Sequence, residues 1–366
     1  MSGAASISEP GSGPALPAPA LSTPALIVDL DVFAHNVSEM AALLRGTGKT
    51  VRPHVKTHRT PELARRQLGE GAVGVTCATV GEAEAMVAAG IDDVLVANEI
   101  VSPDKLDRTV ALARVARVTV AADDAEPVIA LSERAARAGV TVGVLVDIDI
   151  MLHRCGVASS ADALELARVV ERSPGLHLTG LMGYEGRVRS SVENRGAKIA
   201  SAYAVLAEVR ESLLRAGLPV ECVSAAGTST LKEALADPTI TEIQAGVYAL
   251  MEPELLDMGL PFRCAAVIRG TVISRHPDRF VVDIGRRAVG VEYGPPVICA
   301  VAATSIRVGD EHTIVALNGP APPLGAHVDF IPGQIRTTFN LHDHVWVSRG
   351  GQIVDRWPVS ARGGSQ

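Results

Sequence analysis

From Thr23 onward, short runs of β-branched residues alternate with longer stretches rich in Ala, Leu and Arg, whose apolar positions recur at helical spacing. This alternation predicts strands that are each followed by a helix, as around a parallel sheet. A leading strand is expected at 25–29, and eight more at 50–55, 73–78, 93–98, 117–122, 141–148, 177–182, 221–226 and 241–246. Each of the first seven of these eight precedes a helix-like segment. The pattern therefore predicts an α/β fold, a (β/α)8 TIM-like barrel with one strand to spare.

After about residue 260 the residue pattern changes to short apolar runs separated by Gly, Pro and Asp turns. This pattern predicts a C-terminal antiparallel β domain. We expect the barrel over 23–260 and the β domain, completing the active site, over 261–366. Residues 1–22 are rich in Ala, Pro, Ser and Gly and lack an unbroken apolar stretch, which predicts a disordered N-terminal tail.

Length and charge narrow the class of protein. A chain of 366 residues can bury a large core without disulfides. Its net charge of −7 leaves no basic stripe for a phosphate backbone, so nucleic acid is not expected as a partner. The five cysteines are scattered and never spaced C-x-x-C, which indicates reduced thiols in the cytoplasm. No run approaches the roughly 18 apolar residues of a membrane helix.

Chemistry in a (β/α)8 barrel is carried at the carboxyl ends of the strands. Lys56 follows the first of the eight strands, between His54 and His58 and close to Arg52. Neighbouring positive charge lowers the pKa of a lysine and suits it to Schiff-base chemistry. A lone lysine at a strand end is more often merely solvated. The other strand ends decide between these two roles.

Phosphate-binding features follow the seventh and eighth strands. The small-residue turn 224–230 opens a helix and offers N–H groups and hydroxyls to an anion. Gly246 lies at the end of the eighth strand, where a phosphate can approach the backbone. Arg154 and Tyr184 follow the fifth and sixth strands. A lysine, a phosphate turn, an arginine and an aromatic ring are thus expected around one barrel mouth.

With these motifs the chain resembles the pyridoxal-phosphate enzymes of alanine-racemase fold (fold type III), in particular the D-threonine aldolase and D-serine dehydratase group. The resemblance covers about residues 23–360. Its most specific elements are R-P-H-V-K-T-H (52–58), S-x-x-G-T (224–228), Q-A-G-V-Y (244–248), V-V-D-I-G (281–285), D-E-H (310–312) and I-P-G-Q-I-R-T-T-F-N-L-H-D (331–343). It implies that pyridoxal 5'-phosphate is the cofactor, that Lys56 holds it covalently and removes the Cα proton, and that the leading strand 25–29 joins the β domain.

The resemblance also implies the remaining site. Residues expected to contact the cofactor are Lys56, Arg154, Tyr184, Gly227, Thr228, Gln244, Gly246, Val247 and Tyr248. Gln244 stands where alanine racemases have an arginine beside the pyridine nitrogen, and an amide donates a hydrogen bond there without protonating the ring. The loop before Arg154 departs from the family pattern, with Ile150 and Met151 where Gly and Met are usual. His58 is a candidate catalytic residue, with a hydrogen-bonded structural role as the alternative.

A divalent metal is doubtful. The aldolases and dehydratases of this group bind one through a histidine and, two residues later, an aspartate or cysteine, but Gln334 and Arg336 occupy these positions here. An arginine cannot coordinate a metal, yet it places a fixed positive charge where the ion would lie. Arg336, a third candidate catalytic residue, would polarise a β-hydroxyl or bind a second carboxylate; a surface ion pair is the plainer alternative. A displaced metal site at His342 and His344, which are expected to share one face of a strand, is the weaker interpretation.

These observations favour a lyase acting on a D-configured, β-hydroxylated amino acid, by aldol cleavage or by dehydration. A racemase needs a second acid or base on the opposite face of the substrate. Alanine racemases supply it from a tyrosine of the β domain, and Arg286 stands in that position here. A racemase is therefore the first alternative, and a non-catalytic cofactor-binding protein is the second. The resemblance further implies a homodimer in which each barrel mouth is completed by the partner.

Overall fold

Eight short parallel strands form the barrel in the computed structural model, which describes residues 21–366. They are β2 (Thr50–Val51), β3 (Val75–Cys77), β4 (Asp93–Glu99), β5 (Arg117–Ala122), β6 (Val142–Ile148), β7 (Leu176–Gly183), β8 (Cys222–Ala225) and β9 (Glu242–Ile243). Their order is β2-β9-β8-β7-β6-β5-β4-β3. The ring closes where the N–H of Val73 donates to Val51 O at 3.1 Å and His54 bridges Thr76. The predicted barrel is confirmed.

The regular part of β2 is shorter than the predicted strand 50–55. Pro53 has no N–H to donate to a neighbouring strand, so the ladder is interrupted there. The chain then enters a short 3₁₀ turn, η1 (Val55–Thr57), which carries Lys56. The predicted tail at 1–22 lies almost wholly outside the described residues.

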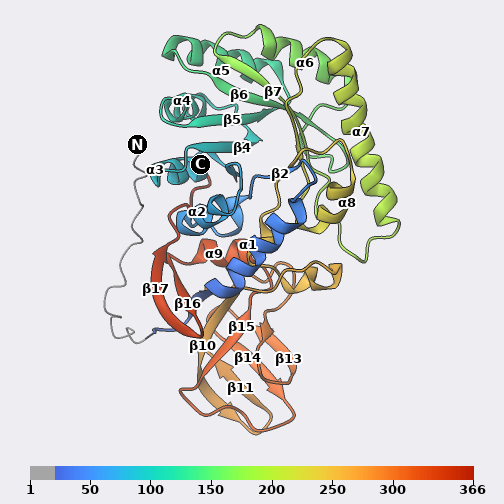
Figure 1. Cartoon of the computed structure of the whole chain (residues 1–366). Helices are drawn as coiled ribbons and strands as arrows, with labels where there is room; N and C mark the ends of the chain where they lie inside the picture. Colours follow the sequence, from blue (N-terminus) through green and yellow to red (C-terminus); the bar gives the residue numbers. More distant parts are fainter. Residues whose placement is uncertain (1–20) are drawn as a thin grey trace, which may run out of the picture.

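Helices surround the barrel (Figure 1). They are α1 (Leu30–Leu44), α2 (Pro61–Gly69), α3 (Val80–Ala88), α4 (Pro103–Leu112), α5 (Ala125–Ala138), α6 (Ser160–Arg172), α7 (Arg195–Arg215) and α8 (Leu231–Ala236). Short 3₁₀ turns follow the last two strands: η2 (Thr228–Thr230), η3 (Val247–Ala249) and η4 (Pro253–Met258). Because β9 leads into η3 and not into an α-helix, α1 packs against η3 and covers that side.

The sequence of α5 shows why these helices form where they do. Asp124 caps its first turn by accepting a hydrogen bond from Glu126 N at 2.7 Å. Val128, Leu131 and Ala135 recur at three- and four-residue spacing and form its buried face. Gly139 ends the helix in the left-handed conformation, at φ 67°, which glycine adopts without a Cβ clash. The cap, the apolar face and the terminating glycine therefore all indicate the same helix, from Ala125 to Ala138.

The second unit is a nine-stranded, mostly antiparallel sheet, drawn below the barrel in Figure 1. Its elements are β1 (Ala25–Asp29), β10 (Ala266–His276), β11 (Arg279–Val282), β12 (Val297–Ile298), β13 (Ala303–Val308), β14 (Thr313–Leu317), β15 (His327–Ile331), α9 (Ile335–Leu341), β16 (His344–Arg349) and β17 (Gln352–Pro358). β1 lies between β10, to which it is antiparallel, and β16, to which it is parallel. The first strand of the described chain is therefore inside the sheet formed by the last third.

α9 was not expected from the sequence. It ends at Leu341, and β16 begins only at His344. His342 caps the helix and its Nε2 lies 2.8 Å from Ala288 O. The expectation that His342 and His344 share one strand face is therefore wrong, and with it goes the geometric basis for a metal between them.

Alternation along the barrel strands separates an inner from an outer core. Val94 and Val96 of β4 belong to the large apolar core under the helices, whereas Leu95 belongs to a small separate cluster with Ala121, Leu145 and Met182. Since side chains alternate across a strand, this small cluster fills the interior of the barrel. Met182 also lines the cavity described below. An inward-facing side chain at the carboxyl end of a strand can therefore line the cavity.

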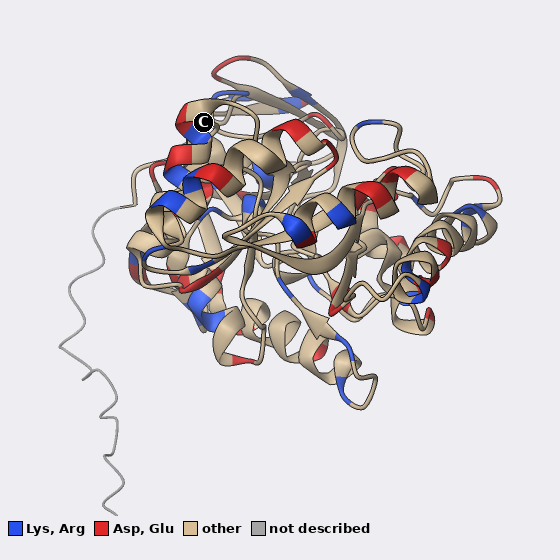
Figure 2. Ribbon diagram, turned by 90° about the horizontal axis from the view of Figure 1, so that it is seen from above, with Lys and Arg blue, Asp and Glu red and all other residues tan. Residues whose placement is uncertain are grey.

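Charged residues of both signs are mixed over the outer helices (Figure 2). This distribution agrees with the absence of a basic stripe in the sequence. Among the described residues, no helix combines the length and apolar character needed to cross a membrane.

Candidate active site

One cavity lies at the carboxyl ends of the barrel strands and reaches α9 of the β domain. Most of the residues predicted for the site line it together: Lys56, Arg154, Tyr184, Gly227, Thr228, Gln244, Gly246, Val247 and Arg336. His58 and Tyr248 are not among the lining residues. The cavity also receives His54 and Arg187, which the sequence analysis did not assign to it.

Lys56 is prepared for nucleophilic chemistry by its surroundings. Burial, and after it the nearby charge of Arg336, lower its pKa to about 8. Its Nζ lies 6.0 Å from the centre of the Tyr184 ring. His54, which also faces the cavity, has a pKa well below its usual value because it is buried and lies near Lys56. At pH 8, therefore, His54 is neutral and about half of the Lys56 side chains are neutral.

Two turns form an anion cradle on the barrel side of the cavity. Thr228 begins η2 and Val247 begins η3, so the first N–H groups of both turns have no partner within the turn. Among the described residues, no group accepts from the N–H of Thr228, Ser229, Gly246 or Val247. Thr228 Oγ1 accepts from Tyr248 N at 3.0 Å and joins the two turns. Converging free N–H groups of this kind bind phosphate.

Gly246 makes this cradle possible. A Cβ at this position would lie 2.6 Å from Thr57 Oγ1 and closer still to His54 O. Its backbone can therefore sit against η1, the turn that carries Lys56, only in the absence of a side chain. The cradle and the lysine are held at a fixed separation by this contact.

Gln244 is oriented by a chain of polar groups. Its Nε2 donates to Ser224 Oγ at 2.9 Å, and Ser224 Oγ donates to Glu242 Oε1 at 2.6 Å. Arg52 closes the chain with an ion pair to Glu242 at 2.9 Å. The second N–H of the amide and its carbonyl remain for a ligand in the cavity.

Arg336 enters the cavity from α9. Gln334 caps this helix, because its Oε1 accepts from Thr337 N at 2.8 Å. The carbonyl of Arg336 accepts from Arg59 Nη1 at 2.7 Å, which holds the backbone in place. Its guanidinium lies 5.4 Å from the centre of the Tyr293 ring. Gln334 is thus a helix cap and Arg336 a cavity residue, and neither acts as a metal ligand in this arrangement.

Comparison with known proteins identifies the family. The alanine racemase N-terminal domain matches residues 28–252, and a putative serine dehydratase domain matches residues 265–348. The chain is 37% identical to a D-threonine aldolase of Arthrobacter sp. over 98% of this chain and 97% of the relative. The chain belongs to the D-threonine aldolase-like family of alanine-racemase fold. The resemblance seen in the sequence is confirmed.

Solved structures agree with this placement. The crystal structure of D-threonine aldolase from Filomicrobium marinum has a TM-score of 0.91 and 36% identity, covering 94% of this chain and 97% of that one. A D-threo-3-hydroxyaspartate dehydratase from Delftia sp. HT23 has a TM-score of 0.83 and 26% identity, covering 93% and 97%. Members of the family are pyridoxal-phosphate-dependent lyases, and this chain is an enzyme of that class.

The residues of the cavity fit pyridoxal phosphate. The free N–H groups of the two turns match its phosphate, and the neutral Lys56 matches its aldehyde. The amide of Gln244 is placed by its polar chain to meet the ring nitrogen. This fit rests on donor chemistry in the chain itself.

His58 lies behind the cavity, and its expected catalytic role is corrected. Its Nδ1 accepts from Thr60 N at 3.1 Å, and its Nε2 lies 3.1 Å from Gln67 Oε1. Burial lowers its pKa to about 4, so it is neutral. Gln67 Nε2 in turn donates to Tyr248 OH at 2.9 Å. The structure therefore makes His58 a supporting residue.

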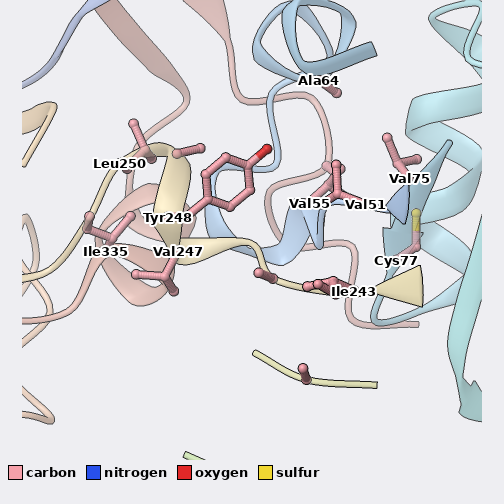
Figure 3. Close-up of a cluster of buried hydrophobic side chains, with 14 of the residues drawn as sticks. Val51, Val55, Ala64, Val75, Cys77, Ile243, Val247, Tyr248, Leu250 and Ile335 are labelled. Atoms are coloured by element: carbon pink, nitrogen blue, oxygen red, sulfur yellow. The ribbon is translucent and has the colours of Figure 1, made fainter. Parts of the chain in front are cut away.

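Tyr248 also faces away from the cavity. Its ring is packed in the buried cluster with Val247, Leu250 and Ile335 (Figure 3). Burial raises the pKa of its hydroxyl. Only its backbone N–H, through Thr228, contributes to the cradle. Its expected role in contacting the cofactor is thus replaced by a role in holding η3.

A group of potential metal ligands lies beside Arg154, away from Gln334 and Arg336. Glu99, Asp123 and Cys155 bring one ligand atom each within 4.8 Å of one another. Asp147 lies next to them, and burial together with Glu99 raises its pKa to about 8. Acidic groups gather in this way in many proteins without binding an ion, and we assign no site to them.

The pKa of Lys56 leads to a first prediction. The rate at which cofactor-free protein captures pyridoxal phosphate should rise roughly fivefold between pH 7 and pH 8 and level off above about pH 9. The amine must be neutral to attack the aldehyde, and its pKa is lowered to about 8, so more of it is neutral as the pH rises through this value. Trapping with borohydride at fixed times, followed by mass spectrometry, measures the rate. Nα-acetyl-lysine treated in parallel corrects for titration of the reagent, and a rate that climbs steadily to pH 10 would contradict the prediction.

Proposed function

We propose that this protein is a pyridoxal-phosphate-dependent lyase that acts on a D-configured β-hydroxy amino acid, by aldol cleavage or by dehydration, without the metal site of its relatives. The observation that carries the proposal is the pairing of a lysine of lowered pKa with an anion cradle in one cavity that the β domain completes with Arg336. The relatives named above act on D-threonine and on D-threo-3-hydroxyaspartate. Both compounds carry a hydroxyl at Cβ.

Bound pyridoxal phosphate supplies an electron sink for the charge that develops at the substrate Cα. Within the described part of the cavity, Lys56 and His54 are the side chains suited to accept a proton near neutral pH. In aldol cleavage, one of them takes the proton of the β-hydroxyl as the bond between Cα and Cβ breaks and an aldehyde leaves. The same group then returns a proton to Cα, which gives glycine. In dehydration, the group takes the Cα proton and passes it to the departing β-hydroxyl, which leaves as water, and hydrolysis of the resulting enamine gives a keto acid and ammonia.

The absence of a metal from the proposal follows from the side chains in the two ligand positions. Gln334 uses its carbonyl oxygen to cap α9, and Arg336 has no lone pair to offer. Its positive charge lies in the cavity beside Lys56. We propose that this fixed charge, and not an ion, acts on the substrate. A homodimer in the cytoplasm, as expected from the sequence, is part of the same proposal.

An assay of five amino acids tests the function. Purified protein loaded with pyridoxal phosphate should release glycine or a keto acid from D-threonine, D-serine or D-3-hydroxyaspartate, and it should leave D-alanine and L-threonine unchanged. Activity should persist within about twofold in the presence of a chelator, because no step requires a metal. Product, keto acid and enantiomer are measured separately.

Each alternative has its own outcome in this assay. Conversion of D-alanine into its enantiomer would show a racemase and reject the proposal. Bound cofactor without any product would show a non-catalytic binding protein. Activity that is lost with chelator and restored by manganese or zinc would overturn the metal-free part alone.

A further inference from the structure

Cationic side chains dominate the cavity. Lys56, Arg154, Arg187 and Arg336 line it, and no Asp or Glu of the described residues does so. This distribution runs against the net charge of −7 of the whole chain. A cavity of this kind selects anionic ligands.

Arg336 is the least compensated of these groups. Its Nε and Nη2 are buried and have no acceptor among the described residues. No ion pair to its guanidinium is formed within that part of the chain. A buried charge without a partner is costly, and an arriving anion removes the cost. The arginine is thus prepared for a ligand and contributes little to the fold itself.

The geometry of the two free nitrogens indicates which anion. Nε and Nη2 lie on the same edge of the planar guanidinium, the edge that donates two parallel hydrogen bonds to a carboxylate. A hydroxyl would use only one of these donors. Of the two roles left open by the sequence, binding a carboxylate therefore uses the site more fully than polarising a hydroxyl.

A second arginine stands beside it. Arg187 and Arg336 lie 4.3 Å and 5.4 Å from the centre of the same Tyr293 ring. Arg187 forms ion pairs with Glu252 at 2.7 Å and Glu254 at 2.9 Å, and its buried Nε has no partner. Arg189, also near this ring, pairs with Glu254. Arg187 and Arg189 use both carboxylates and Arg336 pairs with neither of them, so one positive charge is left over.

Glu252 fixes the two arginines relative to each other. It is fully buried, and its Oε1 accepts from the N–H of Ile335 at 3.0 Å while its Oε2 holds Arg187. Ile335 directly precedes Arg336 in α9. The loop after β7 and the helix of the β domain are thereby locked into one anion-binding wall. The phosphate cradle is separate from it, since it is made of backbone groups of η2 and η3.

We propose that Arg336, supported by Arg187 and Tyr293, binds a second carboxylate of the substrate, so that the preferred substrate is a D-configured β-hydroxy amino dicarboxylic acid. This inference rests on the proposed function and names its substrate class. Arg154, which is more exposed and has five N–H donors, is left for the α-carboxylate. Arg336 is then the residue that determines specificity.

Binding of two unreactive probes to the loaded enzyme tests the inference. D-Aspartate and D-alanine both lack a β-hydroxyl and differ by one carboxylate. By calorimetry, we expect wild-type protein to bind D-aspartate at least about tenfold more tightly than D-alanine. Arg336→Gln should weaken D-aspartate about 10- to 100-fold and change D-alanine less than about threefold, and Arg336→Lys should recover part of the loss. Arg307→Gln, an exposed arginine of β13, is the matched control and should change neither.

The thermal midpoint distinguishes a ligand-binding arginine from a structural one, because substitution of a structural arginine would lower it. Because no acceptor among residues 21–366 pairs with the Arg336 guanidinium, Arg336→Gln should melt at or above the wild-type temperature. Equal weakening of both probes would place the α-carboxylate at Arg336 and overturn the inference, as would no weakening at all. These measurements need no turnover, so they stand even if no substrate is cleaved. Conversely, cleavage of D-threonine without a preference for D-aspartate would keep the proposed function and reject the subsite.

Discussion

Lys56→Ala should reduce turnover by at least about a thousandfold, since it removes both the covalent attachment of the cofactor and the proposed base. Lys56 lines the cavity and has a pKa lowered to about 8, which suits both roles. After borohydride reduction, wild-type protein should carry the mass of the reduced cofactor on the peptide that contains Lys56. The variant should bind the cofactor only non-covalently.

Lys198→Ala is the control for this experiment. Lys198 is exposed on α7, outside the cavity, and its removal should leave turnover and labelling unchanged. Recovery of the reduced cofactor on any lysine other than Lys56 would reject the assignment. Normal turnover in Lys56→Ala would reject it as well.

Gly246→Ala should lower the thermal midpoint by about 2 to 4 °C, the scale of an overpacked core position in a chain of this length. The added Cβ would meet His54 O and Thr57 Oγ1, so either η1 or η3 must shift. A shift of either turn separates the cradle from Lys56, and affinity for pyridoxal phosphate should fall with stability. Differential scanning calorimetry and fluorescence titration measure the two effects.

Gly196→Ala offers the opposite expectation with the same chemical change. Gly196 lies in the first turn of α7, and a Cβ there would meet nothing within 4 Å. Alanine is the better helix former by up to about 1 kcal/mol, so this variant should melt at or slightly above the wild-type temperature. If both variants had the same thermal midpoint, close packing at Gly246 would not explain an effect of its substitution by alanine.

The barrel was predictable because each strand and helix carries its own local pattern. Period-two and helical spacing need no knowledge of distant residues, and strand ends must meet at one edge of a parallel sheet. Lys56, Thr228 and Gly246 could therefore be placed together although nearly two hundred residues separate the first from the last. Their common location follows from topology alone.

Side-chain direction within short turns was not predictable. Lys56 and His58 are two residues apart, yet η1 turns the first into the cavity and the second toward Gln67. A strand continued beyond residue 55 would have placed both on one face. Tyr248 was misplaced for the same reason, because η3 directs its ring into the core while its N–H faces Thr228.

Contacts between units were also beyond sequence reasoning. Arg187 and Tyr293 belong to no motif, and only the docking of the β domain on the barrel brings them beside Arg336. The helix α9 lies between strands, in a region whose residue pattern predicts β structure. It has only seven residues, which are too few to show a helical period. A polar cap at Gln334, three residues before Thr337, was the available signal.

The position of β1 has a consequence for the order in which the chain assembles. β1 lies between β10 and β16, which are synthesised more than two hundred and three hundred residues later. During translation the barrel strands can pair with one another as they emerge, but one edge of β1 stays unpaired until β10 has been made and the other until β16 has been made. Pairings between such distant segments are slow to form, and open strand edges invite contact with other chains. Completion of the β domain is thus tied to release of nearly the whole polypeptide, and any shortening that removes β16 leaves one edge of the first strand open.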